Sequence, residues 1–256
     1  MTNMDFHAAK IMIRSWWING KNRYKTTLCS VRRNYSAGAA EDQTPCYVLD
    51  EAALIKNAEL MGNIAKRTGC KMLLAQKAFS NYDCYHLLEP YLTGTEASGL
   101  YEARLGAQEM PGKEVHVFCA GYREDEFEEL LSFADHIVFN SPSQLLRFGK
   151  RVKEAGKNAG LRINPECSTQ EEHAIYDPCA PGSRMGTTRA QWETAVRKHP
   201  ELIGLLDGIH FHTLCEQDSS DLETTLTAVK TKFGDLISQV KWLNLGGGPS
   251  YYKTRL

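Results

Sequence analysis

The sequence predicts an α/β fold of parallel strands, and within that class an incomplete (β/α)8 barrel. Short β-rich runs alternate with amphipathic helical stretches over most of the chain, which is the pattern of βαβ units in a parallel sheet. The runs are apolar almost throughout, as strands covered on both faces must be. A glycine run follows the last of them, and a phosphate site on the loop after strand seven is typical of barrels.

An open doubly wound sheet shows the same alternation and is the alternative architecture. A nucleotide-binding sheet of that kind usually has a glycine-rich turn after its first strand. Here the first repeated strand ends in Gln76, Lys77, Ala78 and Phe79, without a glycine. The position of the glycine run therefore favours the barrel.

The expected elements follow one another along the chain in βαβ order. Helix starts carry capping residues, namely Asp50, Ser141 before Pro142, and Thr188 with Gln191 three residues later. Strands are expected at 71–76, 94–97, 115–120, 136–140, 160–164, 208–212 and 242–245, and helices at 51–66, 100–107, 124–133, 142–155, 189–197 and 221–240. A further run at 46–49 precedes the barrel and is compatible with pairing to a second domain.

Seven barrel strands are one fewer than a closed barrel needs, and a complete barrel typically takes ~250 residues. We therefore expect residues 43–256 to form a partial barrel domain from a truncated chain, with its edges exposed. Residues 1–42 are set apart, because the stretch from Phe6 to Ala40 has basic but no acidic residues. Such a leader is typical of an organellar transit peptide. An untargeted disordered extension, or a start codon assigned too early, explains it equally well.

Composition limits the classes of function. The chain has 256 residues, of which 42% are hydrophobic and 24% charged, with a net charge of -1. These values exclude a disordered chain and a polybasic nucleic-acid binder. No run of ~18 apolar residues predicts a membrane-spanning helix. The eight cysteines are scattered without a Cys-x-x-Cys pair, which favours buried thiols over a zinc ribbon or a disulfide framework. We expect a cytoplasmic protein, with mitochondria as the alternative from the N-terminal stretch.

Two sets of residues at strand ends are candidates for chemistry. Lys77 ends the first barrel strand on the side where barrel enzymes hold their active sites, and a desolvated lysine amine can form a Schiff base; a surface lysine is the alternative. His210 and His212 share one face of their strand, opposite Phe211. They could stack on a flat ring, could be hydrogen-bonded core histidines, or could bind a metal, although no third ligand is evident. We therefore expect no metal site.

Charged and flexible residues complete the candidate site. Arg162 is a charge inside an apolar strand, so it needs an anion or a structural salt bridge. Arg184 ends a Pro/Gly-rich loop at 176–184 that is long enough to cover a site. Glu96 and Ser98 end the second strand, where polar side chains would face the same site. The run Gly246, Gly247 and Gly248 allows backbone N–H groups to close on a phosphate, although a plain turn is equally compatible.

Together these segments resemble a known family. Residues 76–79, 161–165, 177–184, 210–217 and 244–248 look like those of carboxynorspermidine (carboxyspermidine) decarboxylases. Those are pyridoxal-phosphate enzymes of the alanine-racemase and ornithine-decarboxylase fold type. The stretch His212-Thr-Leu-Cys-Glu-Gln217 and the stretch Asp177-Pro-Cys-Ala-Pro-Gly-Ser-Arg184 are the specific parts. The resemblance runs from about Thr44 to Gly248.

The resemblance implies a role for each candidate. Lys77 would bind pyridoxal 5'-phosphate covalently, His212 would stack on its ring, and Gly246, Gly247 and Gly248 would hold its phosphate. Arg162 and Arg184 would lie near the oxygen-bearing edge of the cofactor. Glu216 is our own candidate for contact with a nitrogen of the polyamine substrate, from its charge and its place beside His212. In the full-length family the enzyme is a homodimer with a C-terminal β domain, which we expect to be absent here.

The implied reaction is decarboxylation of carboxynorspermidine or carboxyspermidine to norspermidine or spermidine. Two other interpretations stay open. One is a related decarboxylase that acts on diaminopimelate, ornithine or arginine. The enzymes for these substrates share the lysine and the glycine run. The other is a truncated homologue that binds the cofactor without turnover.

Overall fold

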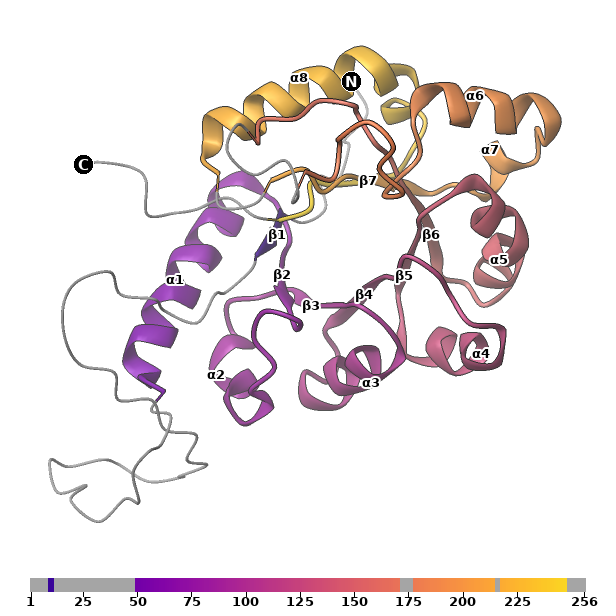
Figure 1. Cartoon of the computed structure of the whole chain (residues 1–256). Helices are drawn as coiled ribbons and strands as arrows, with labels where there is room; N and C mark the ends of the chain where they lie inside the picture. Colours follow the sequence, from indigo (N-terminus) through magenta and orange to yellow (C-terminus); the bar gives the residue numbers. More distant parts are fainter. Residues whose placement is uncertain (1–8, 12–48, 171–176, 215–216, 248–256) are drawn as a thin grey trace, which may run out of the picture.

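Eight parallel strands form one sheet, in the order β1 to β8, in the computed structural model. The structure describes residues 9–11, 49–170, 177–214 and 217–247. The strands follow one another around a ring, and the helices lie outside it (Figure 1). Within the described residues, no strand pairing joins β8 to β1. The predicted incomplete barrel is therefore confirmed, and the open doubly wound sheet is excluded.

All seven strands expected after residue 70 are present, with ends that differ from the prediction by at most two residues. The inner strands pair in register, for example His116 with His136 and Arg162 with His210. The strands are β2(Met72–Ala75), β3(Gly94–Ala97), β4(Glu114–Phe118), β5(His136–Phe139), β6(Asn158–Arg162), β7(Gly208–His210) and β8(Trp242–Asn244).

One strand comes from the segment that was expected to lie outside the fold. β1(Ala9–Ile11) pairs in parallel with β2, with Ala9 opposite Met72. The exclusion of residues 1–42 is therefore wrong for these three residues, which take the place beside β2 where the last strand of a closed barrel pairs. The rest of 1–42 lies outside the described residues. So do residues 46–48 of the expected early strand, and Leu49 belongs to no strand.

The six predicted helices are also present. They are α1(Glu51–Thr68), α3(Leu100–Glu109), α4(Glu124–Phe133), α5(Pro142–Glu154), α6(Arg189–Lys198) and α8(Ser219–Ile237). Two single-turn helices, α2(Tyr85–Leu88) and α7(Leu202–Leu205), and the 3₁₀ turn Tyr82–Cys84 were not predicted. They are too short to show a helical period.

The three predicted helix caps are confirmed. The Asp50 side chain accepts a hydrogen bond from the N–H of Ala53 over 2.9 Å at the start of α1. Ser141 caps α5, and Thr188 and Gln191 form a reciprocal capping box at the start of α6. Such caps satisfy N–H groups that have no partner inside the helix.

Alternate strand residues separate the two faces of the sheet. Val117, Ile137, Phe139 and Leu161 belong to the buried apolar cluster that also contains Phe127 of α4, so these residues face the helices. Since strand side chains alternate, their neighbours point into the barrel. Those inward residues are Glu96, His116, Phe118, His136, Arg162, His210, Trp242 and Asn244.

The indole of Trp242 fills the barrel interior across its neighbouring strands. A Cβ at Gly208 would lie 2.0 Å from the ring, and one at Gly160 would lie 2.3 Å from it. Only glycine leaves room for the indole at these two positions. The inward faces of β6 and β7 are therefore built around Trp242.

No helix in the part of the chain that the structure describes has the length and apolarity needed to cross a bilayer.

Candidate active site

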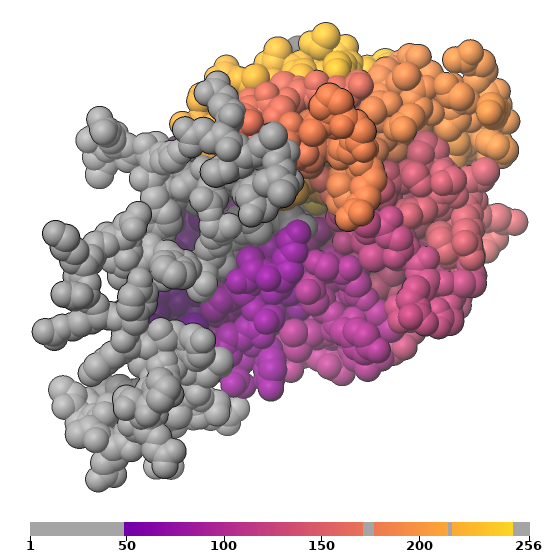
Figure 2. Space-filling view, in the orientation of Figure 1, coloured from indigo at the N-terminus to yellow at the C-terminus, as the bar shows by residue number. Residues whose placement is uncertain are grey.

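The predicted site residues that the structure describes follow the carboxyl ends of their strands. Segments after β6, coloured orange, stand over this end of the barrel in the space-filling view (Figure 2). Lys77 lies in the turn after β2, and its side chain is exposed. Met72 and Leu74 pack in the cluster under α1 and α2, so Leu73 and Ala75 form the inward row of β2. The strand ends at Ala75, and Lys77 follows it in a turn at the carboxyl end.

Arg162 is the last residue of β6 and is 3% exposed. Its Nη2 donates a hydrogen bond to the carbonyl of His212 over 3.2 Å, and its guanidinium lies 4.7 Å from the centre of the Phe118 ring. No ion pair to Arg162 occurs among the described residues, so the salt-bridge interpretation is not supported. Burial lowers the pKa of Arg162 to about 10, against the opposing charges of Cys179 and Glu96. It therefore stays a cation at neutral pH, with guanidinium donors to offer an anion.

The two histidines after β6 differ in their surroundings. His210 ends β7, is 1% exposed and lies with its ring 5.3 Å from the Phe118 ring. His212 is half-buried, and its Nδ1 accepts a hydrogen bond from the N–H of Gly247 over 3.1 Å. Phe211, between them, packs on the helix side of the sheet. In a neutral His212 ring, the proton is therefore on Nε2.

Gly246 cannot carry a side chain at its place after β8. Its φ is +70°, and a Cβ would lie 2.3 Å from the carbonyl oxygen of Phe211 and 3.0 Å from Cβ of His212. Its N–H donates to Oδ1 of Asn244 over 2.8 Å. The glycine loop after β8 therefore lies directly against the backbone of His212.

The phosphate-binding role of the glycine run stays a prediction. The described N–H groups of Gly246 and Gly247 already donate within the chain, to Asn244 and His212. Gly248 lies outside the described residues, as does Glu216. Any phosphate held here by Gly246 or Gly247 would have to replace or share these hydrogen bonds.

Arg184 lies apart from the group formed by Arg162, His212 and Gly246. Its side chain is exposed in the loop before α6 and lines a groove between α5 and α6. Its carbonyl accepts a hydrogen bond from Nδ2 of Asn140 over 2.9 Å. The structure thus gives Arg184 a loop-anchoring contact, and its role near a cofactor stays a prediction.

Two features of the barrel interior were not singled out from the sequence. Phe118 contacts both Arg162 and His210. Alternation along β4 places it on the inward face, so it could have been predicted from the sequence. The second feature, Glu114, His116 and His136, lies at the amino ends of β4 and β5 and forms a candidate metal-binding cluster. No metal site had been expected, because the sequence showed no third ligand beside His210 and His212; Glu114, His116 and His136 come from two different strands.

No protein-family model matches the chain. It is 38% identical over 206 residues to the carboxynorspermidine/carboxyspermidine decarboxylase of Campylobacter jejuni, a match that covers 80% of this chain and 51% of the relative. It is 39% identical over 205 residues to the carboxyaminopropylagmatine decarboxylase of Synechocystis, with the same two coverages. The carboxynorspermidine/carboxyspermidine decarboxylase of Herminiimonas arsenicoxydans is 34% identical over 209 residues, which cover 81% of this chain and 54% of that protein.

Solved structures agree with these relatives. The crystal structure of carboxynorspermidine decarboxylase complexed with norspermidine, from Campylobacter jejuni, matches with a TM-score of 0.72 and 35% identity, over 83% of this chain and 53% of that one. Diaminopimelate decarboxylase from Helicobacter pylori matches with a TM-score of 0.62 and 20% identity, over 78% of this chain and 54% of that one, which shows the fold alone. The chain is therefore similar in sequence and in fold to these decarboxylases, and it spans about half the length of the relatives it matches.

Proposed function

We propose that the chain forms the larger part of the cofactor-binding barrel of a decarboxylase that uses pyridoxal phosphate and acts on a carboxylated polyamine. The observation that carries the proposal is the placement of Lys77, Arg162 and His212 at one end of the barrel. Its reaction class comes from the relatives, which are decarboxylases by name.

The described residues fit the cofactor. Lys77 lies in the turn at the carboxyl end of β2 and offers an exposed amine at this end of the barrel. Arg162 is a buried cation without an anionic partner among the described residues, and it suits an oxygen-rich edge. At Gly246 the backbone comes so close to His212 that no side chain intervenes.

Each of these residues has a definite task in the proposed reaction. The Lys77 amine would hold the cofactor covalently and would be the group that the substrate amine displaces. Gly247 donates a hydrogen bond to the ring of His212, and Arg162 donates one to its carbonyl. Together they would hold the imidazole in one orientation for stacking. When bound, pyridoxal phosphate supplies an electron sink for the electrons left by the departing CO2.

Carboxynorspermidine or carboxyspermidine is the proposed substrate, with Glu216 as a contact for a substrate nitrogen. The relative from Synechocystis, which acts by its name on carboxyaminopropylagmatine, is 39% identical, so identity alone does not separate these related substrates. If Glu216 contacts the substrate, Glu216→Gln should raise KM while kcat changes little; an unchanged KM would remove this role. We also propose a homodimer, which size measurement in solution tests.

Covalent labelling tests the centre of the proposal. The untagged chain is incubated with pyridoxal phosphate, reduced with borohydride and mapped by mass spectrometry. Label should concentrate on Lys77, and Lys77→Arg should remove it. Lys150→Arg is the matched control, since the Lys150 side chain is 80% exposed and should leave the label on Lys77 unchanged. Label spread over surface lysines in the wild type would contradict the proposal.

Turnover is tested separately by CO2 release from carboxynorspermidine and from carboxyspermidine. Lys77→Ala should abolish release, and a variant with near-normal kcat would show that the reaction does not need this amine. Release from neither substrate, with label on Lys77, would support a homologue that binds the cofactor without turnover.

A further inference from the structure

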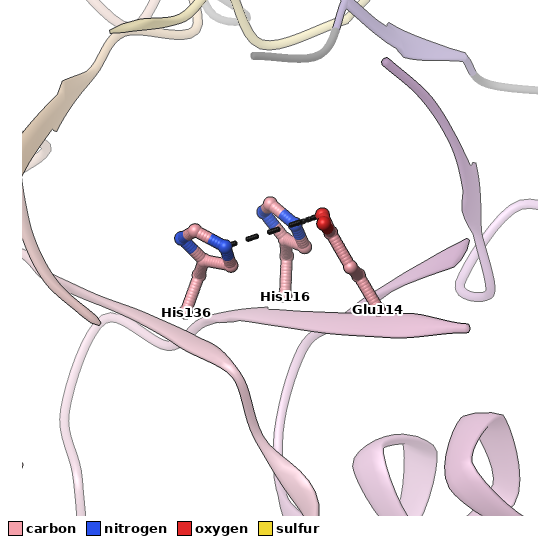
Figure 3. Close-up of side chains that lie close together, drawn as sticks. All are labelled: Glu114, His116 and His136. Carbon is pink, nitrogen blue, oxygen red and sulfur yellow. Dashed lines mark hydrogen bonds and ion pairs between the residues drawn. The ribbon is translucent and has the colours of Figure 1, made fainter. Parts of the chain in front are cut away.

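A second cluster of polar side chains lies inside the barrel at the end opposite Lys77. Glu114 is the first residue of β4, His116 lies two residues further on, and His136 is the first residue of β5. Figure 3 shows the two imidazoles side by side, with the carboxylate of Glu114 directed at them. His116 and His136 are 1% and 5% exposed. The register pairs these two histidines directly across the strands.

The polar atoms of the cluster lie close together. Nε2 of His116 lies 2.9 Å from Oε2 of Glu114, and Nε2 of His136 lies 4.0 Å from the same oxygen. The rings stack with centroids 4.0 Å apart and an interplanar angle of 16°. One ligand atom from each residue lies within 4.8 Å of the other two. Two nitrogens and one carboxylate oxygen thus lie within reach of a single ion, although the near-parallel rings direct their lone pairs side by side.

We propose that Glu114, His116 and His136 bind a divalent transition-metal ion, and we assign Zn²⁺ as the ion that this set fits best. Two imidazoles and a carboxylate are a frequent zinc ligand set, with the fourth position left to water. Bonds of about 2.0–2.1 Å in tetrahedral geometry separate ligand atoms by about 3.3 Å. The distances of 2.9 and 4.0 Å lie on either side of that value. Small shifts, together with a rotation of one imidazole out of the stacked arrangement, would complete the site.

The carboxylate is ionised and keeps one oxygen for the ion. Burial alone would raise the pKa of Glu114, but hydrogen bonds from His116 and Lys71 outweigh it and lower the pKa to about 2. Lys71 pairs with Oε1, whereas Oε2 faces the histidines. Metal-bound carboxylates are commonly hydrogen-bonded through a second group in this way. The Lys71 side chain is 30% exposed, so its ammonium has water to move into when a cation binds.

One nitrogen of His116, the buried Nδ1, has no hydrogen-bond partner among the described residues. A buried nitrogen left without a partner costs about 1–3 kcal/mol, so the protein alone does not satisfy this imidazole. In the metal-bound form the proton lies on Nδ1 and the Nε2 lone pair faces the ion. The Nδ1–H group would still have no partner among the described residues, so the metal bond has to offset this cost as well.

The ion would join β4 to β5 near the base of the barrel interior. The His136 ring lies 5.2 Å from the Trp242 ring, edge to face, and Glu114 is 28% exposed on its other side. Solvent therefore reaches the carboxylate but not the histidines. This arrangement provides an entry path for the ion and a place for a water ligand.

Calorimetric titration with zinc chloride tests the site on the untagged, chelator-treated chain without pyridoxal phosphate. One ion per chain is expected, and Glu114→Gln and His136→Gln should each weaken binding at least about tenfold. His199→Gln is the matched control, because His199 forms an exposed pair with Glu201 over 3.2 Å and should bind zinc as the wild type does. Equal affinity of the wild type and Glu114→Gln would overturn the proposal.

Cobalt substitution keeps the test independent of how the variants fold. Co²⁺ bound to the wild-type chain should show the visible bands of tetrahedral nitrogen and oxygen ligation. Thiolate charge-transfer bands, or octahedral bands alone, would overturn the assignment. Lys71→Met should strengthen binding, since it removes the competing cation. The site lies at the opposite end of the barrel from Lys77, so this test and the labelling of Lys77 can fail separately.

Discussion

The N–H of Gly247 donates a hydrogen bond to Nδ1 of His212 over 3.1 Å, so the loop after β8 holds the ring of a residue that follows β7. The carbonyl of His212 accepts a second hydrogen bond, from Arg162 of β6. Three strands of the barrel thus fix one half-buried imidazole. Such support from neighbouring groups is what a side chain needs in order to present a ring in one orientation.

His212→Phe should separate the ring from its anchor. Phenylalanine keeps a flat ring but cannot accept the Gly247 hydrogen bond, which is worth about 0.5–1.5 kcal/mol. The Kd for pyridoxal phosphate, measured by fluorescence titration, should rise about three- to tenfold. The free energy of unfolding should fall by no more than about 1.5 kcal/mol. His199→Phe, at an exposed histidine, serves as the control, and an unchanged Kd in His212→Phe would count against the anchoring role.

Gly246→Ala should disturb the same contact from the backbone side. The added Cβ would lie 2.3 Å from the Phe211 carbonyl at a φ of +70°, so overpacking adds to left-handed strain, and the free energy of unfolding should fall by about 3 kcal/mol. Gly69→Ala is the matched control, because Gly69 has a φ of +73° with nothing within 4 Å of its Cβ position. That change should cost only about 1–2 kcal/mol. Equal losses of stability in urea unfolding would show that the contact with Phe211 and His212 is unimportant.

Periodicity was sufficient to predict most of this architecture. Apolar runs predicted the seven strands from β2 to β8, because this signal is local. β1 was missed, because three residues in a basic stretch carry no strand period and their pairing with β2 is nonlocal. The cluster of Glu114, His116 and His136 was missed for a related reason. Only the pairing register places His116 opposite His136, and a register cannot be read from either strand alone.

Asp207→Asn should weaken the amino-terminal end of β6, β7 and β8. The Asp207 carboxylate is 3% exposed and accepts hydrogen bonds from Lys153, Lys241 and the N–H of Ala159 over 2.6, 2.9 and 3.0 Å. Loss of one member of a fully buried pair costs about 3–5 kcal/mol. Here both lysines reach water, so we expect about 2–3 kcal/mol in urea unfolding.

Asp125→Asn is the control for this change, because the Asp125 side chain is 65% exposed and pairs with Arg123 at the surface. It should alter the free energy of unfolding by less than about 1 kcal/mol. If both variants lost the same small amount, the buried carboxylate would have no special part in joining these strands.

The free energy of unfolding should fall as the pH drops below 4.5, the ordinary pKa of the Glu114 carboxyl. Because the folded-state pKa is about 2 rather than 4.5, the ionised carboxylate stabilises the folded state fully above about pH 4.5, and this contribution is lost as the pH falls toward 2. The difference of about 2.5 units sets an upper limit of about 3 kcal/mol.

Urea unfolding of the wild type and of Glu114→Gln, both with chelator, should therefore give stabilities that converge between pH 5 and pH 2. Glu128→Gln, whose side chain is 74% exposed, should stay close to the wild type throughout. A constant gap between the wild type and Glu114→Gln at every pH would show that the pKa of Glu114 is not depressed, since only a group that binds protons differently in the folded and unfolded states changes stability with pH.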